Sequence, residues 1–155
     1  FGQEVQGLEG ANITGDTSED ASAFEVGVST SIYNINLVAY GYSGEGVGTT
    51  ALLRDGFSSD GKMRDSDGGY VQATYVIPTG TKLGVSYGVS KLDDNAADAG
   101  DSLVKENTML TIGAYHPLTK HLNLVAEYSN VEAEAMNGNP TAESDIFAVG
   151  AILFF

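Results

Sequence analysis

Two histidines lie close together in the sequence and are the first candidates for acid–base or metal chemistry. His116 and His121 flank a predicted tight turn, with Lys120 beside the second. The sequence places neither a serine nor paired carboxylates next to them, so general acid–base and nucleophilic catalysis both lack a second group. Their spacing is not that of a metal motif either. We interpret them as turn residues, and we predict that the chain is not an enzyme and needs no cofactor.

The segment 64–69 is the one plausible ion site. Asp65 and Asp67, followed by Gly68, are similar to the start of a calcium loop, in which alternating carboxylates converge on one cation. The bidentate glutamate that completes such a loop is absent downstream, and Asp-Gly is also a common turn former. Calcium is therefore only a weak candidate, and the absence of cysteine excludes thiolate metal sites and disulfides.

The distribution of charged residues indicates where the loops lie and which partners are excluded. The chain has 21 acidic and 7 basic residues, a formal net charge of −14, over 155 residues. The acid collects in segments rich in Gly, Asp, Ser and Asn, which predict loops at 15–22, 55–69, 92–102 and 131–144. Such a chain repels polyanions, so nucleic acid is excluded as a partner. The loops are either simply a hydrated exterior surface or divalent-cation sites that bridge to neighbouring anionic lipid.

The segments between these loops have the pattern of β-hairpins. At 23–43, 70–90 and 109–129, an alternating run, a tight turn and a second alternating run follow one another. The predicted turns are 33–36, 78–81 and 118–120. A weaker strand at 4–13 and a final strand at 145–155 bring the total to about eight. In an outer-membrane barrel, an even number of strands would leave both chain ends on the periplasmic side. No apolar run approaches the length of about 20 residues that a membrane helix needs.

Short turns that alternate with long loops predict an all-β protein, a transmembrane antiparallel up-and-down β-barrel. Most of these strands separate an apolar face from a polar one. The apolar face carries residues such as Val26, Val85 and Ile112. In the run from Leu37 to Ser43 the facing is ambiguous. The polar residues, predicted to line an aqueous pore, are Glu25, Ser29, Ser31, Gln72, Thr74, Lys82, Ser86, Ser90, Thr111, Asn123, Glu127 and Ser129, with Tyr115 beside them. Strands of a soluble sandwich would alternate in the same way.

The last strand carries an unbroken apolar stripe with an aromatic residue at each end. Its members are Phe147, Val149, Ala151, Leu153 and Phe155. A lipid-facing strand between aromatic girdles needs this pattern. The stripe also resembles the C-terminal aromatic strand by which bacterial outer-membrane proteins are recognised for insertion, so we predict that it is an assembly signal. Because the opposite face is nearly as apolar, a buried strand of a soluble sandwich is the alternative.

Two stretches resemble the general porins of Gram-negative bacteria. The run TIGAYHPLTKHLNLVAEY, at 111–128, is similar to one porin hairpin, and ATYVIPTGTKLGVSYG, at 73–88, is similar to another. The resemblance covers 70–155 well and 23–43 loosely. It fails in the last strand, where Ala151 and Ile152 replace the usual basic residues. Since porins of this family have about 16 strands, the resemblance implies that residues 1–155 form a single segment, the C-terminal half of such a barrel. Phe1 is no initiator residue, which fits a processed or cut chain.

The resemblance also implies a function. Such a protein is a homotrimer in the bacterial outer membrane, surrounded by lipid and lipopolysaccharide and inserted by the barrel-assembly machinery. It would form a water-filled channel for passive diffusion of small hydrophilic solutes and ions. Glu25 and Glu127, set against Lys82, predict a mild preference for cations. The alternative is a small closed outer-membrane barrel with a structural or adhesive role, which acts through its acidic extracellular loops.

Overall fold

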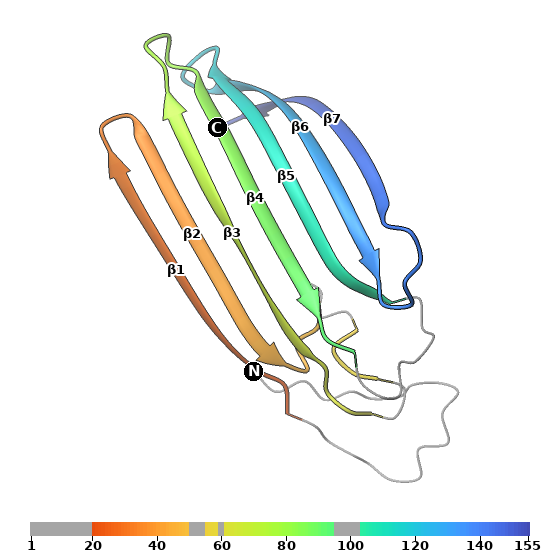
Figure 1. Ribbon diagram of the computed structural model, residues 1–155. Coiled ribbons are helices and arrows are strands. Elements are labelled where there is room, and N and C mark those ends of the chain that lie inside the picture. The colour runs from red at the N-terminus through yellow and green to blue at the C-terminus, as the bar shows by residue number, and fades with distance from the viewer. Residues whose placement is uncertain (1–19, 50–54, 59–60, 95–102) are drawn as a thin grey trace.

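The protein is a single antiparallel sheet in which every strand pairs with its neighbours in sequence (Figure 1). The computed structural model describes residues 20–49, 55–58, 61–94 and 103–155. Within these ranges the prediction of an all-β, antiparallel, up-and-down topology is confirmed; the predicted strand at 4–13 lies outside them. The sheet has seven strands, namely β1 (Ser22–Ile32), β2 (Ile35–Glu45), β3 (Asp65–Val76), β4 (Lys82–Leu92), β5 (Val104–Pro117), β6 (Leu122–Ala135) and β7 (Ala142–Leu153).

The two ends of the sheet differ in their connections (Figure 1). At one end, called here the turn end, the strands are joined by the short segments 33–34, 77–81 and 118–121. At the other, the loop end, the connections are 46–64, 93–103 and 136–141. The first turn is tighter than predicted, because Ile35 and Asn36 already pair with β1 and only two residues remain between the strands. Tyr33 there has a φ of 53°, in the left-handed region.

The strands reach further toward the loop end than the sequence predicts. Residues 65–69 belong to β3, 131–135 to β6 and 142–144 to β7, so the predicted loops at 55–69 and 131–144 are wrong over these residues. The error has a physical cause. Strand pairing uses backbone groups, so it continues into segments that are polar and rich in glycine, although such a composition predicts a loop. Of the other two predicted loops, Ser22 belongs to β1, Leu92 to β4, and most of the rest lies outside the described residues.

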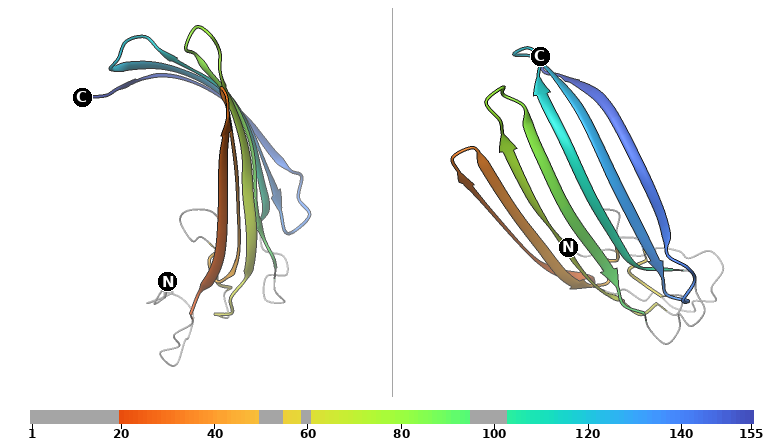
Figure 2. Two further views of the ribbon diagram at one scale, coloured as in Figure 1. Left: turned by 90° about the vertical axis from the view of Figure 1, so that its left-hand side faces the viewer. Right: turned by 45° about the horizontal axis from the view of Figure 1, so that its top comes forward.

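Seen edge-on, the sheet is one curved layer (Figure 2). In the described ranges nothing makes a second layer, and the only buried apolar residues are Ala21 and Leu92. β1 and β7 are the two edges of the sheet and do not pair with each other, so the sheet is open. None of the described segments is a helix long and apolar enough to cross a membrane.

A folded segment joins β2 to β3 at the loop end. Phe57 and Met63 form a β-bridge, and the N–H of Gly46 donates to the carbonyl of Arg64 at 2.9 Å. The guanidinium of Arg64, which is only 4% exposed, donates to the carbonyls of Asp55 and Phe57 at 2.7 and 2.6 Å. These bonds join the described parts of the connection to one another near the point where β2 ends and β3 begins.

Candidate functional site

The pairing register assigns each strand residue to one of two faces. Residues directly opposite each other in an antiparallel pair project to the same side, so an assignment made in one strand extends across the sheet. On the first side, called here the apolar face, lie residues such as Phe24, Val28, Leu37, Ala39, Val71, Ala73, Leu83, Val85, Tyr87, Leu110, Ile112, Leu124, Ala126, Tyr128, Phe147, Val149, Ala151 and Leu153.

The second side, called here the polar face, carries all the residues that the sequence predicts to line a pore. The register continues from Ser29 through Val38, Gln72, Ser86 and Thr111 to Ser129, strand by strand. By the same alternation Glu25, Ser31, Thr74, Lys82, Ser90, Asn123 and Glu127 project to this side. These residues therefore share one surface. That this surface lines a pore stays a prediction.

The ambiguous strand β2 is resolved by hydrogen bonds on the polar face. The hydroxyl of Tyr40 donates to the Glu25 carboxylate at 2.7 Å, and the hydroxyls of Tyr42 and Ser90 are 2.8 Å apart. Leu37 and Ala39 consequently lie on the apolar face. Sequence reasoning missed the two tyrosines because a tyrosine is amphipathic and counts as apolar in an alternation pattern. Alternation counted from the pair Ile32–Ile35, which is next to the turn, would have assigned both tyrosines to the polar face.

Three tyrosines lie against glycines of the polar face. An added Cβ would stand 3.5 Å from the ring of Tyr40 at Gly27 and 2.7 Å from the ring of Tyr42 at Gly68. The third pair is on β5, where a Cβ on Gly113 would stand 2.7 Å from the hydroxyl of Tyr115. Each glycine leaves room for a ring that then reaches a polar partner. For Tyr115 the partner is Glu127, whose carboxylate accepts its hydroxyl at 2.5 Å.

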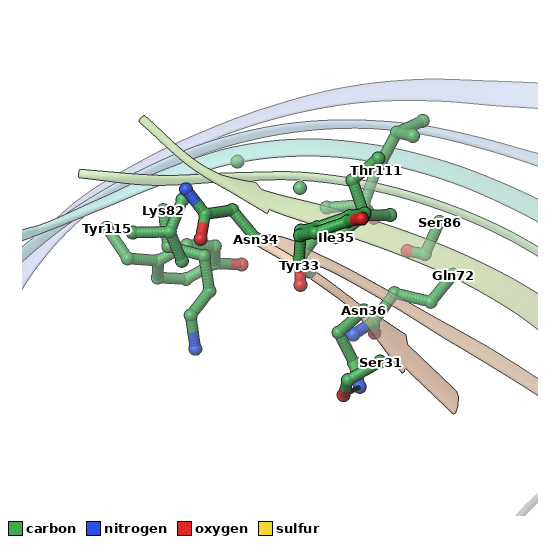
Figure 3. A pocket seen from close by; sticks show the side chains of 15 residues that line it. Ser31, Tyr33, Asn34, Ile35, Asn36, Gln72, Lys82, Ser86, Thr111 and Tyr115 are labelled. Carbon is green, nitrogen blue, oxygen red and sulfur yellow. Dashed lines mark hydrogen bonds between the residues drawn. The ribbon is translucent and has the colours of Figure 1, made fainter. Parts of the chain in front are cut away.

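A hollow of about 520 Å³ lies on the polar face toward the turn end (Figure 3). Its polar wall is made by side chains of β1 to β5 and of the first turn. They are Ser31, Tyr33, Asn34, Asn36, Gln72, Thr74, Lys82, Ser86, Thr111 and Tyr115. No aspartate or glutamate is among the residues that line the hollow, although the chain as a whole has a net charge of −14.

The apolar face is open over its whole width. Phe24, Phe147 and Val149 are 73%, 75% and 73% exposed, and no described segment covers them. The predicted assembly stripe lies on this face from Phe147 to Leu153. β7 ends at Leu153, two residues before the predicted end of the strand. The N–H of Phe154 still donates to the carbonyl of His121 at 2.8 Å, and Phe155 follows without strand pairing.

Toward the loop end the apolar face becomes acidic. Tyr128 marks the boundary, where its hydroxyl donates to the Asp145 carboxylate at 2.7 Å. The amide of Asn130 donates to Asp145 at 3.0 Å and to Glu143 at 2.9 Å. Lys91 pairs with Glu106 at 3.4 Å. Part of the acid that the sequence assigns to loops therefore belongs to strand ends.

The weak calcium candidates lie in this acidic region. Asp65 and Asp67 occupy alternate positions of β3, opposite Glu45 and Ser43 of β2. They belong to a paired strand and do not form the loop that the calcium motif requires. The described residues contain no group of three His, Asp or Glu side chains that could hold a metal ion.

The two histidines are separated by the end of β5. His116 is the next-to-last residue of that strand, and not a turn residue as predicted, and its Nδ1 is 2.9 Å from the hydroxyl of Thr81. His121 lies in the turn, where its backbone N–H donates to the side chain of Thr119 at 3.2 Å. The contacts of both are local to the turn end. The absence of catalysis stays a prediction.

Comparison with known proteins adds no relative, since no family model, no curated protein and no solved structure matches the chain. The resemblance to general porins stays a prediction.

Proposed function

We propose that this chain is part of a β-barrel in the bacterial outer membrane, with its apolar face toward lipid and its polar face toward a water-filled channel. The channel passes small hydrophilic solutes and ions by passive diffusion. One observation carries the proposal: the register separates apolar from polar side chains across β1 to β6, and over the central part of this single layer neither face is covered by a described segment.

The exposed apolar face supports lipid as its solvent. The largest apolar patch of a typical soluble monomer is about 300–600 Å², whereas here large apolar side chains stand exposed on every strand from β1 to β7. The strands are 11 to 14 residues long. A tilted membrane strand needs about 9–11 residues, so each strand is long enough to span the bilayer and to extend beyond it at the loop end.

The polar face supports an aqueous lumen. A barrel of about eight strands is filled by its own side chains, whereas one of about 16 strands leaves a channel. Here the polar face carries serines, threonines and glycines, and its tyrosines lie along the sheet over glycines. Such a surface suits water better than it fills a core. We therefore propose that the chain supplies one part of a large barrel, as the porin resemblance implies, and that the barrel is one unit of a homotrimer.

The charges suggest a weak selectivity. Glu25 and Glu127 lie on the polar face with Lys82, and acidic strand residues gather at the loop end, where we place the mouth of the channel. Selection in a diffusion pore follows its width and the field of the lining charges. We propose a mild preference for cations.

Reconstitution of the full-length protein in planar bilayers tests this function. We expect stepwise conductance and, in a gradient of potassium chloride, a reversal potential of the sign that indicates cation preference. The variant Glu127→Gln should reduce that potential, and Glu132→Gln, a change of the same chemistry at the loop end, serves as its control. Absence of conductance from a correctly folded protein would disprove the channel, and anion selectivity would disprove the proposed preference.

A further inference from the structure

The hollow of the polar face has a floor and a rim that follow from the register. Gly84 on β4 lies opposite Thr74 on one side and Gly113 on the other. An added Cβ on Gly84 would stand 3.4 Å from the Thr74 side chain and 3.7 Å from the Tyr115 ring. Because glycine has no side chain, the space between Thr74 and Tyr115 stays open and forms the bottom of the hollow. In the adjacent row Gln72 lies opposite Ser86, and at the turn end Lys82 lies opposite Tyr115.

Polar side chains of the polar face fall into two sets. The first set is bonded internally: Tyr40 to Glu25, Tyr42 to Ser90, Thr111 to Ser129, Tyr115 to Glu127 and Asn36 to Ser31. The second set has no side-chain hydrogen bond or ion pair with the described residues, and it includes Gln72, Thr74, Lys82 and Ser86, as well as Ser29, Tyr70, Asn107 and Asn123 elsewhere on the face. Gln72, Thr74, Lys82 and Ser86 line the same hollow. Groups left without an internal partner at one place are available to a ligand.

The charge of the hollow is opposite to that of the chain. Lys82 is its only cation, its ammonium makes no ion pair with the described residues, and no carboxylate lines the hollow. Figure 3 shows Lys82 beside Asn34 and Tyr115, away from Gln72 and Ser86. The cation therefore lies at one end of the hollow, and uncharged donors and acceptors lie at the other.

We propose that this hollow is a subsite for a small solute that has several hydroxyl groups and one negative charge, such as a hydroxylated monocarboxylate. The carboxylate binds the Lys82 ammonium, and the hydroxyls exchange hydrogen bonds with Gln72, Thr74 and Ser86. This inference rests on the proposed function, because it assigns a solute class to the channel. It is compatible with a mild cation preference, since that preference comes from Glu25, Glu127 and the acidic strand ends, and none of these lines the hollow.

Direct binding tests the subsite without any channel. The full-length protein, folded in detergent, is titrated with D-gluconate and observed by NMR on the Lys82 region or by calorimetry. Sorbitol has the same carbon chain without the charge, and acetate has the charge without the hydroxyls. We expect gluconate to bind about tenfold more tightly than either, since one charge-assisted contact or a set of hydroxyl contacts is lost in each comparison. Equal binding of acetate would overturn the hydroxyl part of the proposal, and equal binding of sorbitol would overturn the role of the charge.

Substitutions locate the site. Lys82→Met keeps the aliphatic stem and removes the charge, and we expect gluconate binding to weaken about tenfold. The matched control is Lys120→Met, which removes a cation from the turn end outside the hollow. The double variant Gln72→Leu/Thr74→Val should weaken gluconate binding and leave acetate binding unchanged. An equal loss in Lys82→Met and Lys120→Met would mean general electrostatic attraction and would overturn the subsite.

Recording the channel separates failure of the subsite from failure of the proposed function. A conducting protein that does not bind gluconate retains the channel and loses the subsite. A folded protein that binds gluconate through Lys82 and does not conduct retains the subsite and loses the channel. If both hold, gluconate should reduce the single-channel current in the wild type and in Lys120→Met, and much less in Lys82→Met.

Discussion

The two faces of this sheet are built from the same strands and differ in how their side chains are satisfied. On the polar face tyrosines, serines, threonines and glutamates bond to one another across strands, as Tyr42 does with Ser90. On the apolar face the large side chains lie side by side, and over its central part they have no polar partner and no covering layer. Among the described residues, the apolar face has side-chain hydrogen bonds toward its two ends, between Thr81 and His116 at the turn end and from Tyr128 to Asp145 at the loop end.

This difference is the one that our proposal requires, in which one face meets water and the other meets lipid. A face left in water can form hydrogen bonds among its own groups, whereas a face left in lipid needs none beyond those of the backbone. The sheet itself is held by the backbone ladder, which is continuous from β1 to β7. A substitution should therefore have opposite consequences on adjacent residues of one strand, and each prediction below compares such positions.

The largest effect on stability is expected from a charge on the apolar face. Val85 lies in the central part of β4 on that face, and Ser86 is its neighbour on the polar face. An arginine at the membrane midplane destabilises a β-barrel by about 2–4 kcal/mol. We expect Val85→Arg to lower the free energy of unfolding from lipid vesicles by that amount and Ser86→Arg to change it by less than about 0.5 kcal/mol. Equal effects of the two changes would mean that the faces do not meet different solvents.

The contrast between the faces was predictable from the sequence only where alternation was clean. In β3 to β6 small polar residues alternate with aliphatic ones, so Thr74, Lys82 and Thr111 could be assigned without a structure. In β2 the alternation was hidden, because both faces carry residues that count as apolar, and Tyr40 shows its polarity only through Glu25.

The ends of the strands and the hollow could not be predicted from the sequence, for different reasons. Asp65 and Asp67 belong to β3, yet their polarity predicts a loop, because a strand that continues past an apolar belt carries the residues that water requires. The hollow depends on register, which places Gly84 between Thr74 and Gly113 from three different strands. No local pattern carries that information.

A smaller effect is expected from a methyl group on the polar face. At Gly68 an added Cβ would stand 2.6 Å from the carbonyl oxygen of Val89 and 2.7 Å from the ring of Tyr42, so the ring must move and its bond to Ser90 must break. Overpacking of this kind costs about 1–3 kcal/mol. Gly150, which has no atom within 4 Å of such a Cβ, is the control on the same face. Urea unfolding in vesicles should show a loss for Gly68→Ala and none for Gly150→Ala.

A hydroxyl should matter on one face and not on the other. Tyr115→Phe removes the donor to Glu127 and should lower the free energy of unfolding by about 1 kcal/mol. Tyr87 lies on the apolar face, where its hydroxyl bonds to no described residue, so Tyr87→Phe should change stability by less than about 0.3 kcal/mol. The same unfolding measurement compares the two variants. A larger loss for Tyr87→Phe would assign polar partners to the face that we place in lipid.

The smallest effect on the folded sheet is expected at Phe155, where the expected effect on assembly is large. Phe155 lies beyond the end of β7 and is fully exposed, so Phe155→Ala should change the free energy of unfolding in detergent by less than about 0.5 kcal/mol. If the C-terminal stripe is read as a signal during insertion, the same variant should be several-fold less abundant in outer membranes, because a recognition contact is lost that the folded sheet does not contain. Phe154→Ala is the control, since it leaves the backbone bond to His121 intact and removes an aromatic side chain, 52% exposed, from the adjacent position. Normal abundance of Phe155→Ala would show that the stripe is not the signal. An equal deficit in both variants would mean that the chain end needs apolar bulk in general, and that neither aromatic residue is recognised by its position.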